Sequence, residues 1–260
     1  MTGYNIVHVA LNPPELLEAS LIKQVAVILK KDAYESRLLL SGKIPKLIAH
    51  FDTSEAAEAI VKALTSLGLA AVTLADSELH NPSPSTTEFT AHSLSFGEGE
   101  VRFSAKNGTV KTIGTKDLFL ILYGKMRVPI TIKETRTKMK FSMPATLMTG
   151  GIPVWRKSKE SVEDISFQTE YFMRLYGWLA PEPKIEVFES KFDYAFLGTK
   201  IAPSSSANLR MLALELKKMF PKAVLDSRLT DYTPITQGNE IEVTCKLIYL
   251  CHRAGLNIGR

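Results

Sequence analysis

Apolar residues recur with a helical period near the start of the chain. Between residues 16 and 29 they are spaced by three or four positions, which places them on one face of a helix. A second stripe with the same spacing follows Thr53, a residue type that caps helices, and ends before Gly68, which fits the position just after a helix. Apolar helix faces this wide must be buried against other parts of the protein. The residues predicted to form the core of this region are Leu17, Leu21, Val25, Ile28, Ile60 and Leu64.

Short β-favouring segments lie between these helices, together with one further helical segment. The predicted order over residues 4–76 is β-α-α-β-α-β, with the helices on one side of a small sheet. The predicted strands are 4–11, 46–51 and 69–75, and the predicted helices are 16–29, 33–40 and 54–67.

The same region resembles a known family. The matching segments are Val25 to Ile28, Tyr34 to Leu39, Gly42 to Lys46, Thr53 to Ile60, and Leu67-Gly68. They are similar to the C-terminal domain of the bacterial ribosomal stalk protein, whose fold is shared with a bacterial adaptor that presents substrates to a protease. Because members of this fold bind proteins with their helices and are not enzymes, the resemblance implies a docking module. The chain has Leu29 and Asp32 where the stalk family has basic residues, so the resemblance carries over the fold and none of the partners.

A polar, proline-containing stretch follows this module. Pro82 and Pro84 stand among serine and threonine residues, a composition typical of linkers. The predicted domains are therefore a stalk-like docking module at 1–78, a linker at 79–87, and a β-rich domain with C-terminal helices at 88–260.

Beyond the linker the pattern alternates, as in strands with turns between them. Asn107-Gly108 between two such segments is a hairpin signal. Strands are expected at 88–96, 101–105, 110–113, 118–123, 128–137 and 184–188, and helices at 167–176, after Ser204, and at 241–253. The first five strands predict an antiparallel meander, and a pleckstrin-homology-like arrangement is one alternative for it. The fold class is thus α+β. Segments at 192–198 and 226–229 are similar to those of uncharacterised bacterial proteins and imply no function.

Composition indicates an ordinary globular protein, with 45% hydrophobic and 23% charged residues. The apolar runs are shorter than the roughly 20 residues that a transmembrane helix needs, and the N-terminus lacks the features of a secretory signal. The two cysteines, Cys245 and Cys251, are expected to be buried and inert. These observations predict a cytoplasmic protein.

Positive charge is concentrated in the middle of the chain. The net charge is +5, and residues 81–160 alone carry +7. Within residues 125–159 the only acid is Glu134, and the basic residues are Lys125, Arg127, Lys133, Arg136, Lys138, Lys140, Arg156, Lys157 and Lys159. Such a segment attracts phosphates of RNA, DNA or anionic lipid. The alternatives are a solvated surface and a protein partner. Alternation predicts a strand that ends or bulges near Glu134 and leaves the next three basic residues in a loop.

Catalytic and metal-binding motifs are not evident. The five histidines lack ligand spacing, Gly150-Gly151 lacks the residues of a phosphate-binding loop, and Ser204 to Ser206 is expected to cap a helix. Asp76, Glu78 and His80 are expected to lie in a polar loop at a strand end, and Asp226, Arg228 and Asp231 are expected to pair at the surface.

The resulting functional prediction is a non-catalytic interaction or regulatory protein with a protein partner, no cofactor and no metal. The first alternative is a binder of nucleic acid or an anionic membrane surface through residues 125–159. The second is an enzyme whose site is assembled from distant residues. The oligomeric state is left open.

Overall fold

The structure is a computed structural model that describes residues 6–80, 89–141, 143–148, 150, 152, 155–180, 183–231 and 239–255. For residues 80, 132–136, 141, 145–146, 156, 158 and 160–164 only the main chain is described. The chain forms two compact units, one of Met1–Met126 with Glu170–Arg260 and the other of Arg127–Thr169.

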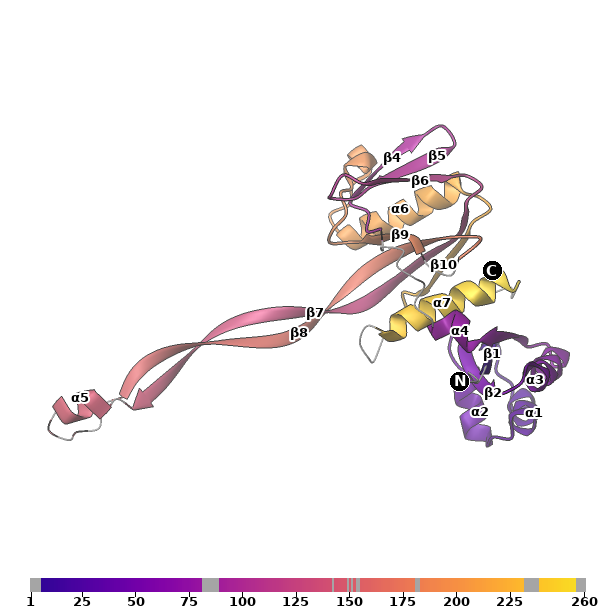
Figure 1. The fold of residues 1–260 in the computed structure, drawn as a ribbon, viewed down its shortest axis with the longest axis horizontal. Coiled ribbons are helices and arrows are strands. Elements are labelled where there is room, and N and C mark those ends of the chain that lie inside the picture. The colour runs from indigo at the N-terminus through magenta and orange to yellow at the C-terminus, as the bar shows by residue number, and fades with distance from the viewer. Residues whose placement is uncertain are drawn as a thin grey trace, which may run out of the picture. The chain divides into compact units, whose positions relative to one another are not determined.

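The N-terminal part has the predicted β-α-α-β-α-β order (Figure 1). The strands form an antiparallel sheet in the order β2-β1-β3. The elements are β1 (Val7–Asn12), α1 (Ala19–Leu29), α2 (Ala33–Leu40), β2 (Lys46–Phe51), α3 (Ser54–Ser66) and β3 (Ala70–Ala75). The Thr53 hydroxyl accepts a hydrogen bond from Ala56 N at 3.3 Å, and Gly68 takes a left-handed φ of 80° after α3. Both caps were predicted from the sequence.

The core of this module lies between the sheet and the three helices. Val25 and Leu64 are fully buried there, while Leu17, Leu21, Ile28 and Ile60 are partly buried and pack against the same cluster. The predicted apolar faces of α1 and α3 are therefore confirmed, although Leu17 lies before α1, which begins at Ala19 and not at residue 16.

The opposite face of this sheet is also covered. Every residue of β1 from Val7 to Leu11 is buried, although alternate side chains point to opposite faces. Ala10 and Leu74 belong to a second cluster, which includes residues of α4 (Asp76–His80) and α7 (Asn239–Arg253). The segment around Asp76 is therefore a short helix, where a polar loop was expected.

The remaining described strands form two further sheets. A meander consists of β4 (Ser93–Gly97), β5 (Glu100–Ser104) and β6 (Val110–Gly114). A mixed sheet has the order β10-β7-β8-β9, and its members are β7 (Leu118–Phe141), β8 (Trp155–Gly177), β9 (Pro183–Phe188) and β10 (Val224–Leu229). In this sheet β10 is parallel to β7 and β9 is antiparallel to β8. Apolar side chains of both sheets share one cluster with α6 (Ser205–Met219), whose cap is Ser204 as predicted.

Two parts of the β-rich prediction were wrong. The fourth and fifth predicted strands are a single strand, β7, which belongs to a different sheet from β6, so the five-stranded meander is absent. Among the described residues the strands close no barrel, and the pleckstrin-homology-like alternative finds no support. Residues 167–176, predicted as a helix, are part of β8. From Phe172 to Gly177 every residue of β8 is buried, so the period of two that identifies a strand is lost.

The predicted linker falls largely outside the described residues. Helix α4 ends at His80, and residues 81–88 lie outside the described part of the chain. The domain boundary at 79–87 stays a prediction.

Candidate anion-binding arm

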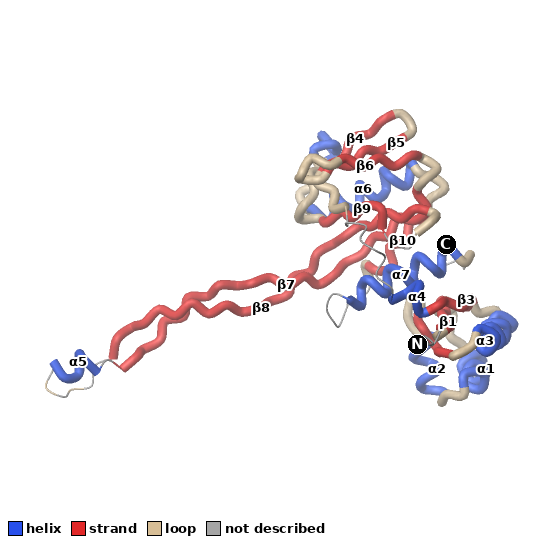
Figure 2. Tube along the Cα trace, viewed as in Figure 1, coloured by secondary structure: helices blue, strands red, loops and turns tan. Residues whose placement is uncertain are grey.

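Residues 127–169 form an arm made of two long strands and a short helix. The chain runs out along β7, passes through α5 (Met143–Met148) and returns along β8, and the two strands twist about each other (Figures 1 and 2). At about 3.3 Å per residue, the 15 residues of β7 in the arm cover about 50 Å. The described pairings with other strands involve residues 120–124 of β7 and 172–176 of β8, outside the arm.

Both faces of the ribbon are exposed near its helical end. Residues 137–140 of β7 are all exposed, although successive side chains of a strand point to opposite faces. A two-stranded ribbon without a buried face does not have to keep apolar residues on one side. This is the physical reason why the predicted strand end near Glu134 is wrong: β7 continues to Phe141, and Lys138 and Lys140 lie in it instead of in a loop. The alternative, a bulge near Glu134, stays a prediction.

The basic residues predicted to bind anions are distributed along this ribbon. Lys125 is partly exposed and precedes the arm in the chain, and Arg127 is exposed with its guanidinium 5.5 Å from the centre of the Phe167 ring. The other described basic side chains are all exposed: Lys138, Lys140, Lys157 and Lys159. The side chains of Lys133, Arg136 and Arg156 lie outside the described part, although their main chain is in β7 and β8.

The positive charge is uneven within the arm. The returning strand contains the acids Glu160, Glu163 and Asp164, and the outgoing strand contains Glu134. Residues 136–159, by contrast, contain six basic residues and no acid. The excess charge is therefore concentrated around the helical end of the ribbon, where α5 joins the two strands (Figure 1).

The same end of the arm exposes large apolar side chains. Met148 is 90% exposed and Leu147 is 75% exposed, both on α5. We call residues 139–155 the tip, and its exposed large apolar residues are Met139, Met143, Leu147, Met148, Ile152 and Trp155. Sequence reasoning missed this patch, although the apolar residues and the absence of acids were visible in the sequence. Exposure could not be inferred because the same residues would equally suit a buried segment.

A second polar cluster joins three elements of the N-terminal module. His8 Nε2 lies 2.9 Å from Asp76 Oδ1, and His8 Nδ1 lies 2.6 Å from His50 Nδ1. If His8 donates from Nε2 to the carboxylate, its Nδ1 is an acceptor and His50 must donate from Nδ1. Burial, followed by the proximity of His8, lowers the pKa of His50. This row of hydrogen-bonded side chains could not be predicted from the sequence, because it depends on His8 and His50 being opposite each other in the β1–β2 ladder.

The group of Asp226 and Arg228 is not the surface ion pair that was predicted. The Asp226 side chain is only 3% exposed, and Arg228 Nη2 and His252 Nε2 lie 2.7 Å and 2.8 Å from its Oδ2 atom. Burial raises the pKa of Asp226, but hydrogen bonds from His252 and Arg228 outweigh this effect and hold the pKa far below its usual range. The third member, Asp231, does pair at the surface, with Lys43 at 2.8 Å.

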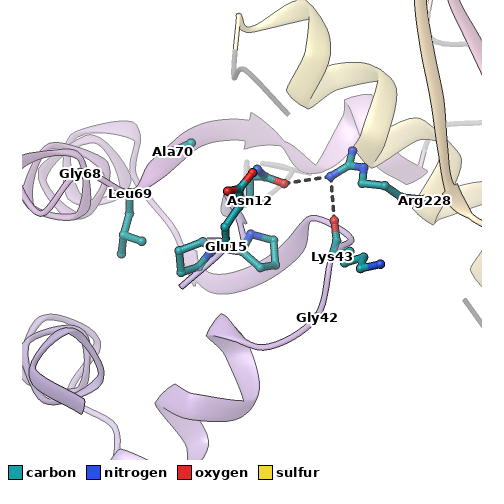
Figure 3. A pocket seen from close by; sticks show the side chains of 10 residues that line it. Asn12, Glu15, Gly42, Lys43, Gly68, Leu69, Ala70 and Arg228 are labelled. Carbon is teal, nitrogen blue, oxygen red and sulfur yellow. Dashed lines mark hydrogen bonds between the residues drawn. The ribbon is translucent and has the colours of Figure 1, made fainter. Parts of the chain in front are cut away.

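Arg228 also borders a hollow of about 530 Å³, shown in Figure 3. Its Nη1 atom donates to Asn12 Oδ1 at 3.0 Å and to the Lys43 carbonyl at 2.7 Å. Because these contacts and Asp226 already use the guanidinium, Arg228 serves as a link between the N-terminal module and β10 rather than as an anion site.

Arg174 is likewise neutralised in the core. Its side chain is 3% exposed, its Nε lies 2.6 Å from Glu186 Oε1, and its Nη1 donates to Glu242 Oε2 at 2.8 Å. The arrangement connects β8, β9 and α7 and offers no free charge to a ligand.

Cys245 and Cys251 are free and buried on α7, as predicted. Burial raises the pKa of Cys245 to about 11 and that of Cys251 to about 12.

In the described ranges no group of three or more His, Cys, Asp and Glu side chains could hold a metal ion. In that part of the chain, too, no helix is long and apolar enough to cross a membrane.

Comparisons of the chain with protein-family models, curated proteins and solved structures give no match. The resemblance of residues 4–76 to the stalk family, and the docking role that it implies, therefore stay predictions.

Proposed function

We propose that this protein is a non-catalytic interaction protein that attaches to an anionic partner through the arm. The observation that carries the proposal is the composition of residues 136–159, which contain six basic residues and no acid, together with the exposure of residues 137–140 on both faces of β7. Like charges held this close repel one another unless solvent or a partner neutralises them. Arg174 and Arg228, described above, lie beside buried carboxylates, whereas Lys140, Lys157 and Lys159 of the arm are exposed.

The shape of the arm also supports an external partner. An isolated two-stranded ribbon is marginally stable in water, because each strand has only one neighbour and neither face is buried. A partner that covers the ribbon would supply the missing burial. Lysines near the strand edges disfavour the addition of another strand. We therefore infer that the partner is attracted by the charge along the ribbon and does not pair with it as a further strand.

The test replaces Arg136, Lys138 and Lys140 with alanine in the full chain. Binding to heparin, to duplex DNA and to vesicles containing phosphatidylglycerol is measured over a range of salt concentrations. The parent protein should bind at least one of these probes, with an affinity that falls steeply as salt rises. For duplex DNA, removing three phosphate contacts should reduce the slope of log affinity against log salt by about 3.

The matched control removes the same charge elsewhere. Lys23, Lys62 and Lys222 are exposed residues outside the arm, and their triple alanine variant lowers the net charge equally. Its affinity should stay close to that of the parent protein. Equal losses in both variants, or no binding to any probe by the parent protein, would exclude the arm as an attachment site.

A further inference from the structure

The exposed apolar tip distinguishes among anionic partners. Six large apolar side chains within residues 139–155 are more than half exposed, and three of them lie on α5. Large apolar side chains gathered in one segment mark a surface that is covered in use. The partner must therefore offer apolar material as well as negative charge.

Basic residues surround this apolar segment along the chain on both sides. Lys138 precedes the tip and Lys140 lies among its first residues on the outgoing strand, and Lys157 and Lys159 follow it on the returning strand, all four exposed. Trp155 stands at the border between the tip and the returning lysines and is 57% exposed. This order of apolar end, aromatic border and cationic flank matches the order of a lipid bilayer from acyl chains through the interface to the phosphates.

Nucleic acid and a second copy of the chain fit the tip less well. Proteins that wedge apolar side chains between base pairs insert them at single steps, and six exposed apolar residues exceed what such a step covers. If the arms of two copies of the protein associated, they would bring together two segments that each carry six basic residues and no acid. Charge repulsion would oppose this self-association.

We propose that the arm binds an anionic lipid bilayer and that its tip inserts into the interface between the headgroups and the acyl chains. This inference rests on the proposed function and specifies the partner. Helix α5 has six residues and is about 9 Å long. That length is far below the roughly 30 Å of the hydrocarbon core, so α5 cannot span it, and interfacial helices bury their apolar face only about 5–10 Å deep. The lysines of the two strands would then contact lipid phosphates, each contributing to binding only within about a Debye length of the surface.

The chain provides its own probe of insertion. It contains two tryptophans, Trp155 at the tip and Trp178 outside the arm. Replacing Trp178 with phenylalanine keeps an aromatic ring against Phe119, whose centre is 4.4 Å away, and leaves Trp155 as the only tryptophan. On addition of phosphatidylcholine vesicles that contain phosphatidylglycerol, the emission of Trp155 should move to shorter wavelength and should be quenched by lipids brominated on their acyl chains. Vesicles of phosphatidylcholine alone should give a much smaller effect.

A double substitution in α5 tests the apolar contribution. Leu147→Gln with Met148→Gln removes the two most exposed apolar side chains of the tip and keeps good helix formers. It should weaken binding to vesicles by at least about 10-fold. A tenfold change in affinity corresponds to about 1.4 kcal/mol, which is less than the free energy gained by burying these two side chains. Leu16→Gln, at an 80% exposed position in the N-terminal module, is the matched control and should bind like the parent protein.

The outcomes separate this inference from the proposed function. Arm-dependent binding to heparin or duplex DNA without binding to vesicles would overturn the bilayer inference and leave the proposed function intact. Binding to vesicles without a shift of Trp155 emission, or equal losses in the tip variant and in Leu16→Gln, would overturn the insertion of the tip. Absence of any arm-dependent binding would overturn both proposals.

Discussion

His252 Nε2 lies 2.8 Å from Asp226 Oδ2, and this contact joins α7 to β10 in the interior of the protein. The same carboxylate receives Arg228, which in turn donates to Asn12 at 3.0 Å. A single buried acid thus connects the C-terminal helix, the mixed sheet and the N-terminal module.

Asp226→Asn should destabilise the protein by on the order of 3 kcal/mol, because it removes the buried counterion of Arg228 and the carboxylate that His252 contacts. Urea unfolding at neutral pH measures the loss. Asp231→Asn, which removes only an exposed partner of Lys43, should leave the unfolding midpoint unchanged. A loss of the same size in both variants would contradict the central place of Asp226.

The stability of the parent protein should also fall in acid because of Asp226. The pKa of this carboxyl is lowered in the folded state, so its contribution is present above the pKa of the unfolded chain, about 3.9. As the pH falls below about 4, the unfolded state takes up the proton first and the contribution is progressively lost. Urea unfolding at several pH values should show that the unfolding free energy falls less steeply in acid for Asp226→Asn than for the parent protein. The same pH dependence below pH about 4 in both proteins would contradict this prediction.

Leu64→Ala should cost roughly 2–5 kcal/mol of unfolding free energy, since Leu64 is fully buried between α3 and the sheet. Chemical denaturation followed by circular dichroism provides the measurement. Leu16→Ala, at an exposed position of the same module, should change stability by less than about 0.5 kcal/mol. Similar effects at both positions would mean that the face of α3 is assigned incorrectly.

Gly124→Ala should destabilise the mixed sheet where β7 meets β10. A Cβ atom at Gly124 would lie 2.6 Å from Leu229 Cβ and 3.1 Å from the Phe172 ring, and overpacking of this kind typically costs about 1–3 kcal/mol. Gly177→Ala is the control, because its close neighbour is the flexible end of Lys184, which can move aside. Thermal unfolding should show a lower midpoint for Gly124→Ala alone. An unchanged midpoint would indicate that β10 can shift away from β7.

Cys245 and Cys251 should not react with thiol reagents in the folded protein. Both are buried, and burial raises the pKa of each thiol to about 11 and about 12, so little thiolate exists near neutral pH. An aromatic disulfide reagent should label both thiols only after denaturant is added. Fast labelling of the native chain would show that α7 opens readily.

The sequence by itself determined most of the N-terminal module and the charge of the arm. The bounds of α2 and β2 agree with the predicted ranges, and Thr53, Gly68 and Ser204 occupy the predicted caps. These features are local, because caps and amphipathic stripes depend on neighbours within a few residues. The concentration of lysine and arginine in residues 125–159 is likewise independent of the fold.

Only the tertiary structure decided the rest. Residues 170–177 belong to a strand with a neighbour on each side and are almost entirely buried. Their sequence therefore lacks the alternation of apolar and polar residues that would have identified them as part of β8. The pairing of His8 with His50 and the burial of Asp226 depend on segments that are distant in the sequence. The exposure of the tip has the same origin. An apolar side chain is identical in the sequence whether another element covers it or not, and at Leu147 and Met148 none of the described residues provides that cover.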